Sequence, residues 1–180
     1  MSAESLNLVL SAATLIVVAA AAIAAIVQLR HLRQSNQISA LLEILNQWNQ
    51  PALQAAYVEF SRLGAKLADP AYVELLERPG SLDRGTHQEF LICDFWEQVG
   101  TYVKHGLIDE RILLDVVNAQ VVNAWKLVEP AITIIRATRG PSPFENFEYL
   151  AVRSVQWSRR YPQGTYPPGL PRMADLKRRG

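Results

Sequence analysis

The stretch "LNLVLSAATLIVVAAAAIAAIVQL", residues 6–29, decides the architecture of this chain, because it holds 24 consecutive residues without a charge. At about 1.5 Å of rise per residue, a helix of this length spans about 36 Å, enough to cross a hydrocarbon layer of about 30 Å. A cleaved signal peptide would have a basic start and a small-residue exit, whereas this stretch follows Glu4 and ends in "QLRHLRQ". We therefore predict an uncleaved transmembrane anchor over residues 1–30. A signal peptide and a buried soluble helix are the alternatives.

The charges that flank the stretch predict its orientation. Arg30, His31 and Arg33 follow it, while the residues before it carry only Glu4. Basic residues collect on the cytoplasmic side of membrane helices, so we expect residues 30–180 in the cytoplasm and the N-terminus outside. The lone Cys93 agrees with a reducing compartment, because it has no partner for an intramolecular disulfide. We predict a single-pass protein of the cytoplasmic (inner) membrane, in contact with lipid.

The overall net charge of +1 hides an asymmetry. Residues 31–135 hold 8 basic and 13 acidic side chains, and residues 136–180 hold 9 basic and 3 acidic ones. The basic end is suited to anionic lipid headgroups or an acidic partner, and a solvated tail is the alternative. No nucleic-acid-binding motif accompanies the charge, so we expect no nucleic acid partner.

Apolar residues recur at helical spacing over residues 31–160, which predicts an all-α cytoplasmic domain of about four to five helices. The membrane helix is expected to continue into this domain without a break. A second helix should begin at Pro51, and a short one should follow Asp69 as its N-cap. The next helix is expected over about residues 86–105, and Gly106 is placed to end it in a left-handed C-cap. Its buried stripe should consist of Leu91, Phe95, Val99 and Tyr102.

A long helix should begin after Asp109 as N-cap and bend at Pro130, which lacks a backbone N–H. Its expected inner face comprises Leu113, Val116, Val117, Gln120, Ala124, Leu127 and Ile134. A last helix should start with a capping box, Ser142 to Glu145, and end near Arg160. Residues 161–180 are rich in proline and basic side chains, so we expect an extended tail.

Residues 96–109, "WEQVGTYVKHGLID", form the densest cluster of polar and aromatic side chains. Glu97 and His105 lie eight residues apart, about 12 Å along one helix, so they cannot share a proton or a metal. The chain has three His and one Cys, too few for a typical zinc site, and it carries no phosphate-binding loop or nucleophile elbow. We predict no catalytic, cofactor-binding or metal-binding residues, and ion pairs of Glu148 with Arg153 and of Asp94 with Arg111 and Lys126.

Two functions from different classes remain. The pairs Ala20 with Ala24 and Ala21 with Ala25 have the small-residue spacing that lets membrane helices approach closely, although a GC-rich composition explains alanine equally well. They favour a non-enzymatic accessory subunit or scaffold that binds another membrane protein or itself as a homo-oligomer. The alternative is a membrane-anchored enzyme or small-ligand sensor with a pocket near Glu97, Tyr102 and Trp125.

The succession "FWEQVGTYVKHGLID", "VVNAWKLVEPAI", Arg136 and "PFENFEYLA" resembles the small bacterial membrane proteins grouped as domain of unknown function 4760. The resemblance covers roughly residues 5–155 and leaves out the basic tail. It implies an N-terminal membrane helix followed by a cytoplasmic helical domain, and it implies no particular activity.

Overall fold

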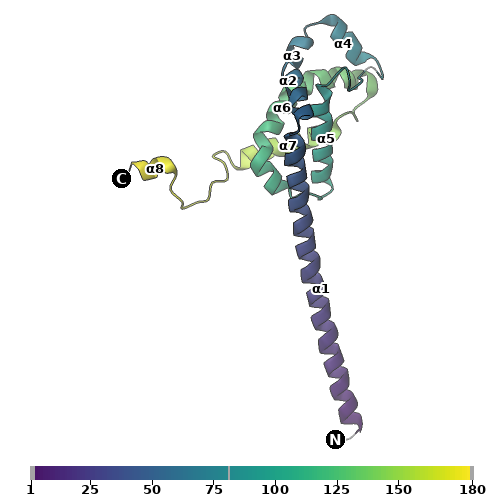
Figure 1. Ribbon diagram of the computed structural model, residues 1–180, viewed down its shortest axis with the longest axis vertical. Coiled ribbons are helices and arrows are strands. Elements are labelled where there is room, and N and C mark those ends of the chain that lie inside the picture. Colours follow the sequence, from purple (N-terminus) through teal and green to yellow (C-terminus); the bar gives the residue numbers. More distant parts are fainter. Residues whose placement is uncertain (1–2, 81, 179–180) are drawn as a thin grey trace. The chain divides into compact units, whose positions relative to one another are not determined.

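A computed structural model describes residues 3–80 and 82–178, and the secondary structure in these two ranges is entirely helical, which confirms the all-α prediction (Figure 1). The chain divides into two compact units, residues 1–43 and residues 44–180. The boundary falls inside the first helix, α1 (Ala3–Trp48), so the last turn of this helix belongs to the second unit.

The first unit consists of most of α1. In the part of the chain that the structure describes, α1 is the one helix long and apolar enough to cross a membrane. The side chains of residues 10–29 are exposed. The hydroxyl of Thr14 donates a hydrogen bond to the carbonyl oxygen of Leu10 at 2.9 Å. This bond satisfies a polar group that would find no partner in lipid.

The second unit begins with three short helices, α2 (Pro51–Ser61), α3 (Leu63–Lys66) and α4 (Pro70–Glu77). The single helix expected after Pro51 is interrupted at Arg62, whose φ of −89° and ψ of 0° leave the helical range. Asp69 caps α4 as predicted, because its carboxylate accepts a hydrogen bond from the backbone N–H of Ala71 at 2.9 Å.

The core is built around α5 (Phe90–Lys104), which packs against α2 and α7 (Glu145–Arg160). Because neighbours cover α5 on more than one side, its buried set is wider than one stripe. Phe95 and Val99 are buried as predicted, whereas Leu91 and Tyr102 are only half-buried. The complete buried set is Phe90, Ile92, Cys93, Phe95, Trp96, Val99, Gly100 and Val103.

The corner after α5 has the predicted geometry. Gly106 has a φ of +66°, in the left-handed region. The N–H of Leu107 bonds to the carbonyl of Tyr102 at 2.9 Å, and the N–H of Gly106 bonds to that of Val103 at 3.0 Å. These two bonds form a Schellman motif. Asp109 then caps α6 (Glu110–Arg139) by accepting a bond from the N–H of Arg111 at 2.8 Å.

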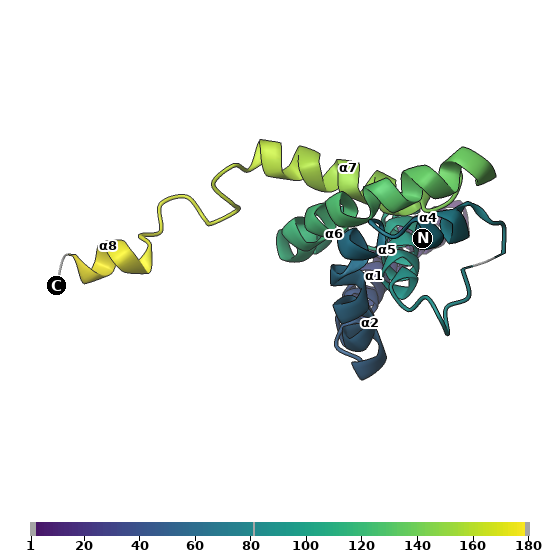
Figure 2. The same cartoon turned by 90° about the horizontal axis from the view of Figure 1, so that it is seen from above.

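The long helix α6 curves around α7. Glu110 near its start pairs with Arg153 at 2.7 Å, and Arg136 near its end pairs with Glu148 at 2.6 Å. A straight helix would separate Glu110 from Arg136 by about 39 Å, yet their partners are only five residues apart on α7. The α6 ribbon accordingly changes direction along its length, and α7 runs beside it (Figure 1, Figure 2). Such a bend is expected of a helix with Pro130 in its interior. The predicted partners of Glu148 and Arg153 were therefore wrong.

The buried face of α6 differs in part from the predicted one. Leu113, Val117 and Ala124 are buried as expected, but Val116 is half exposed and Gln120 is exposed. Val121 takes the place assigned to Gln120, because the apolar side chain of Val121 is buried and the amide of Gln120 is exposed. The observed buried set is Leu113, Leu114, Val117, Val121, Ala124, Val128, Ala131, Ile132 and Ile135.

The start of α7 corrects another prediction. The helix begins at Glu145, and its N-cap is Phe144, so Ser142 and Glu145 do not occupy the N-cap and N3 positions of a capping box. No side chain of this segment caps α7, and Phe144 has a left-handed φ of +59°.

The tail also differs from a fully extended segment. A short helix, α8 (Met173–Lys177), follows the proline-rich part. The side chains of residues 162–174 and 176–178 are exposed, as a tail without a core of its own requires.

Candidate ligand pocket and the polar networks around it

Glu97 replaces the missing cap of α7. One oxygen of its carboxylate accepts a hydrogen bond from the side-chain amide of Asn146 at 2.7 Å. The other accepts one from the backbone N–H of Phe147 at 2.8 Å. A carboxylate at the N-terminus of a helix satisfies unpaired N–H groups and complements the helix dipole. Glu97 therefore has a structural task, which joins α5 to α7.

Tyr102 and Trp125, the other members of the predicted pocket, lie in different surroundings. The hydroxyl of Tyr102 accepts a hydrogen bond from Gln98, one turn earlier on α5. Trp125 packs edge-on against Phe147, with ring centroids 5.2 Å apart, and the guanidinium of Arg136 lies 5.9 Å from its ring. Trp125 also lines a cavity of about 460 Å³ between α6 and α7, which Glu97 and Tyr102 do not line.

The four alanines of the predicted membrane contact all lie on the uninterrupted helix α1. Ala20, Ala21, Ala24 and Ala25 are exposed.

A buried carboxylate that the sequence did not single out as a site lies at the start of α5. Glu89 is 1% exposed and accepts hydrogen bonds from the hydroxyl of Tyr72 at 2.6 Å and the ammonium of Lys66 at 3.1 Å. The Nδ1 atom of His87 lies 3.3 Å from it, and Lys66 also pairs with Glu59 at 3.2 Å. This Glu89 network (Glu59, Lys66, Tyr72, His87 and Glu89) ties α2, α3 and α4 to α5.

The network controls the ionisation of its members. Burial alone would raise the pKa of Glu89, but the hydrogen bonds from Tyr72 and Lys66 outweigh burial and hold its pKa below the ordinary value. Burial and the bond to Glu89 raise the pKa of Tyr72 well above its usual range. Glu89 is therefore a carboxylate paired with neutral and cationic donors, an arrangement that favours stability over proton transfer at neutral pH.

A second ion pair holds the loop before α5. The guanidinium of Arg84 binds both carboxylate oxygens of Asp94, at 2.5 Å and 2.8 Å, and donates to the carbonyl of Leu82 at 2.8 Å. It also lies 5.6 Å from the ring centre of Phe90. The prediction that Asp94 pairs with Arg111 and Lys126 was wrong, because this loop supplies a nearer cation.

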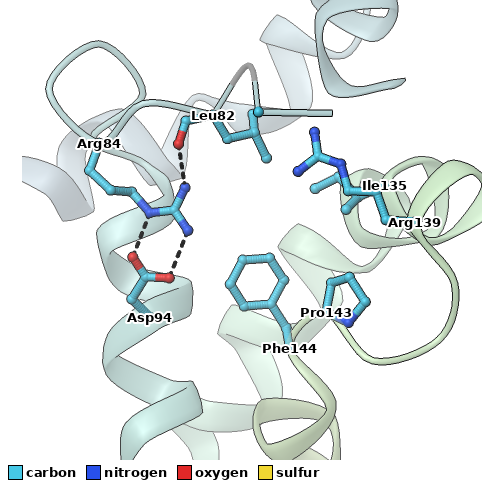
Figure 3. A pocket seen from close by; sticks show the side chains of 8 residues that line it. Leu82, Arg84, Asp94, Ile135, Arg139, Pro143 and Phe144 are labelled. Atoms are coloured by element: carbon cyan, nitrogen blue, oxygen red, sulfur yellow. Dashed lines mark hydrogen bonds and ion pairs between the residues drawn. The ribbon is translucent and has the colours of Figure 1, made fainter. Parts of the chain in front are cut away.

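A cavity of about 510 Å³ lies beside this ion pair. Figure 3 shows Arg84 and Asp94 on one wall, Arg139 on the opposite wall, and Phe144 with Pro143 between them. Arg139 donates hydrogen bonds to the carbonyls of Leu76 and Arg78 at 3.2 Å and 2.5 Å. The remaining lining residues are Gly80, Leu82 and Ile135.

The chemistry of this cavity suits binding. Its volume falls within the range of small-molecule sites. Its one carboxylate, Asp94, is held at both oxygens by Arg84, so its lining offers no ready base or nucleophile. No group of three or more His, Cys, Asp or Glu side chains with metal-binding geometry occurs among the residues that the structure describes.

The sequence did not predict the Glu89 network, because its members are distant along the chain. Tyr72 and Lys66 lie 17 and 23 residues before Glu89, and they belong to separate short helices. His87 and Glu89 share the sequence "HQEF", but this pattern alone does not show that one of the two side chains is completely buried.

Comparison with known proteins supplies the family. No curated protein and no solved structure matches the chain. The model of one family, described as a domain of unknown function, matches residues 15–154, which include the apolar stretch after Thr14, the Glu89 network, the ion pair of Arg84 with Asp94 and the cavity beside it. This chain belongs to the DUF4760 family.

Proposed function

We propose that this protein is a single-span membrane protein whose helical domain acts as a non-enzymatic accessory subunit or scaffold. The observation that carries the proposal is that carboxylates of the folded domain are paired with donors inside the domain itself. Glu89, Asp94 and Glu97 each bind donors from another segment of the fold. A polar network paired in this way stabilises a binding domain, whereas an enzyme keeps acids and bases directed towards a substrate.

The proposed partner is another membrane protein or a second copy of this chain, bound through α1. Ala20 and Ala24 lie one turn apart on an exposed, uninterrupted helix, so a second helix can approach its backbone closely. The helical domain is proposed to lie in the cytoplasm, on the side of Arg30 and Arg33.

The test is the double substitution Ala20→Leu with Ala24→Leu. It keeps the helix hydrophobic, so membrane insertion should survive, but it adds bulk where two backbones would meet. We expect loss of a detergent-stable oligomer or of a co-purifying membrane protein, measured by native mass spectrometry after gentle extraction.

The matched control is Ala19→Leu with Ala22→Leu, the same change on the opposite face of α1. The control should assemble as the parent does. Equal assembly of both variants with the parent would assign the alanines to composition alone and remove α1 as the contact.

The cavity in Figure 3 favours a second function, that of a small-ligand sensor. Leu82→Trp should fill this cavity from its half-buried wall. A sensor would lose its response to the ligand in this variant while still assembling in the membrane. A scaffold would retain all its functions.

A further inference from the structure

The end of the chain combines exposed apolar side chains with positive charge. Tyr166, Leu170, Met173 and Leu176 are 46%, 59%, 69% and 48% exposed. Residues 166–180 carry four basic side chains and one acidic one, Asp175. A solvated linker has no need of four large apolar residues among its charges.

These side chains are arranged by local structure. Met173 and Leu176 lie three residues apart on α8, so they share one face of the helix. Arg172 lies 4.5 Å from the ring centre of Tyr166, whose hydroxyl donates to the carbonyl of Pro171 at 3.1 Å. Tyrosine and arginine have apolar stems and polar ends, which suit the boundary between headgroups and acyl chains.

We propose that residues 166–180, here called the basic tail, bind the anionic lipid surface of the membrane in which α1 is anchored. The proposal rests on the anchoring role of α1 in the proposed function. Positive charge attracts the tail to anionic headgroups, and the apolar side chains then insert at the interface. Neither the charge attraction nor the apolar insertion is strong alone. α1 holds the tail on the same membrane, however, and so raises the effective concentration of the tail there.

Charge and hydrophobicity together favour lipid over an acidic protein. The basic tail has no long amphipathic helix or strand to fit a protein groove, because α8 is five residues long and prolines precede it. The hydroxyl of Thr165 donates to the carboxylate of Asp115 on α6, so the tail leaves the folded domain at a defined point. A lipid surface needs no matching shape and accepts such a short segment.

The experiment uses the full-length protein in lipid nanodiscs, with an environment-sensitive fluorophore on Ala174→Cys. The native Cys93 is buried, so labelling is selective for position 174. One set of discs contains phosphatidylcholine alone, and the other also contains phosphatidylglycerol. We expect a blue shift of the emission in the anionic discs only, and loss of this shift at high salt.

The charge requirement is tested by Arg172→Gln, Lys177→Gln and Arg178→Gln together. This variant should lose the blue shift. The matched control removes the same charge from exposed positions on α6 and α7, with Lys126→Gln, Arg159→Gln and Arg160→Gln, and should keep it. Met173→Ser with Leu176→Ser should reduce the shift in anionic discs, because less apolar surface inserts.

An equal shift in both kinds of disc, or an equal response of the two charge variants, would overturn the proposal. A shift that appears only when polyglutamate is added would assign the tail to an acidic protein instead. Failure of the anchor is seen separately, because the chain would not co-purify with discs of either composition. Both faces of a nanodisc are accessible, so the result does not depend on the orientation of α1.

Discussion

Gly100 determines how closely α5 and α7 approach each other. A Cβ atom at this position would lie 2.0 Å from the carbonyl oxygen of Asn146 and 2.6 Å from its carbon. Both atoms belong to the backbone of α7, so they cannot rotate away as the end of a side chain would. One missing methyl group therefore allows the main helix contact of the core.

Gly100→Ala should lower the free energy of unfolding by about 3 kcal/mol, the upper end of the usual effect of overpacking. Chemical denaturation followed by circular dichroism measures the change. Gly64→Ala is the matched control, because Gly64 is helical and has no atom within 4 Å of an added Cβ. The control should be neutral or stabilising by up to about 1 kcal/mol. Equal stability of the two variants would contradict the close contact.

Glu89 should make stability depend on pH. Its pKa is lower in the folded chain than in the unfolded one, so its stabilisation is present above the ordinary carboxylate pKa and is lost as pH falls through the folded value. Tyr72→Phe removes one hydrogen-bond donor to Glu89 and should raise the pKa of Glu89 in the folded chain. The stabilisation by Glu89 is then lost at a higher pH than in the parent. At neutral pH the free energy of unfolding of the variant should be lower than that of the parent by about 1–3 kcal/mol.

Thermal unfolding over a series of acid pH values measures both effects of Tyr72→Phe. Tyr166→Phe serves as the control, because Tyr166 lies in the exposed tail. Identical pH profiles for the two variants would show that the bond from Tyr72 does not stabilise the Glu89 carboxylate.

At the scale of the helices, most local signals were read correctly, the capping box at Ser142 was not, and the distant partners were missed. Asp69, Gly106 and Asp109 end or begin helices as predicted, because a cap bonds to residues only two to five positions away. Glu97 bonds to Asn146 and Phe147, 49 and 50 residues further along the chain. Nothing in the sequence near Glu97 indicates such a partner, so its role as the cap of α7 required the packed structure.

The same distinction applies to the candidate site. The helical period predicted which segments are helices, but the buried face of α6 depends on how this bent helix packs against α7. The cavity beside Arg84 is formed by a loop, α5, the end of α6 and the segment before α7. These segments meet only after the helices pack, so no local pattern predicts the cavity.

The corner between α5 and α6 provides a prediction at this scale. Gly106→Val should destabilise the domain by about 1–2 kcal/mol, because a branched residue is strained at a φ of +66°. His105→Ala should lower stability by less than about 1 kcal/mol, since His105 is exposed and acts only on the end of the helix dipole. Gly106→Asn is the control for Gly106→Val, because asparagine tolerates the left-handed region.

Denaturation curves and an assembly assay on the same preparations decide the role of this corner. Loss of assembly in His105→Ala with unchanged stability would show that the corner is a contact site and that its role exceeds helix termination.

For the whole molecule, the proposed membrane anchor raises the question of which side of the membrane holds the folded domain. The domain has one cysteine, Cys93, and it is buried, so a cysteine added elsewhere reports its own position. The basic residues Arg30 and Arg33 follow the apolar stretch, and the residues before it carry only Glu4. A single-span chain with these flanks should keep its larger part in the cytoplasm.

A cysteine in place of Ser2 should react with a membrane-impermeant thiol reagent in intact cells, and one in place of Gly180 should react only after the cells are opened. Gel shift of the labelled protein measures both. The reverse pattern would invert the orientation. If the mature protein were shorter than expected and had lost the cysteine at position 2, the apolar stretch would be a cleaved signal peptide.

The cap that Glu97 provides also has a consequence for the order of folding. α7 has no cap of its own, and an isolated helix of 16 residues is marginally stable in water. Its first turn therefore becomes stable only when α5 is already formed and presents its carboxylate. During synthesis, α5 leaves the ribosome before α7, so the carboxylate of Glu97 is present before the helix that it caps. We expect α7 to dock as the final step, and a chain that stops before it would leave the carboxylate of Glu97 without the N–H of Phe147.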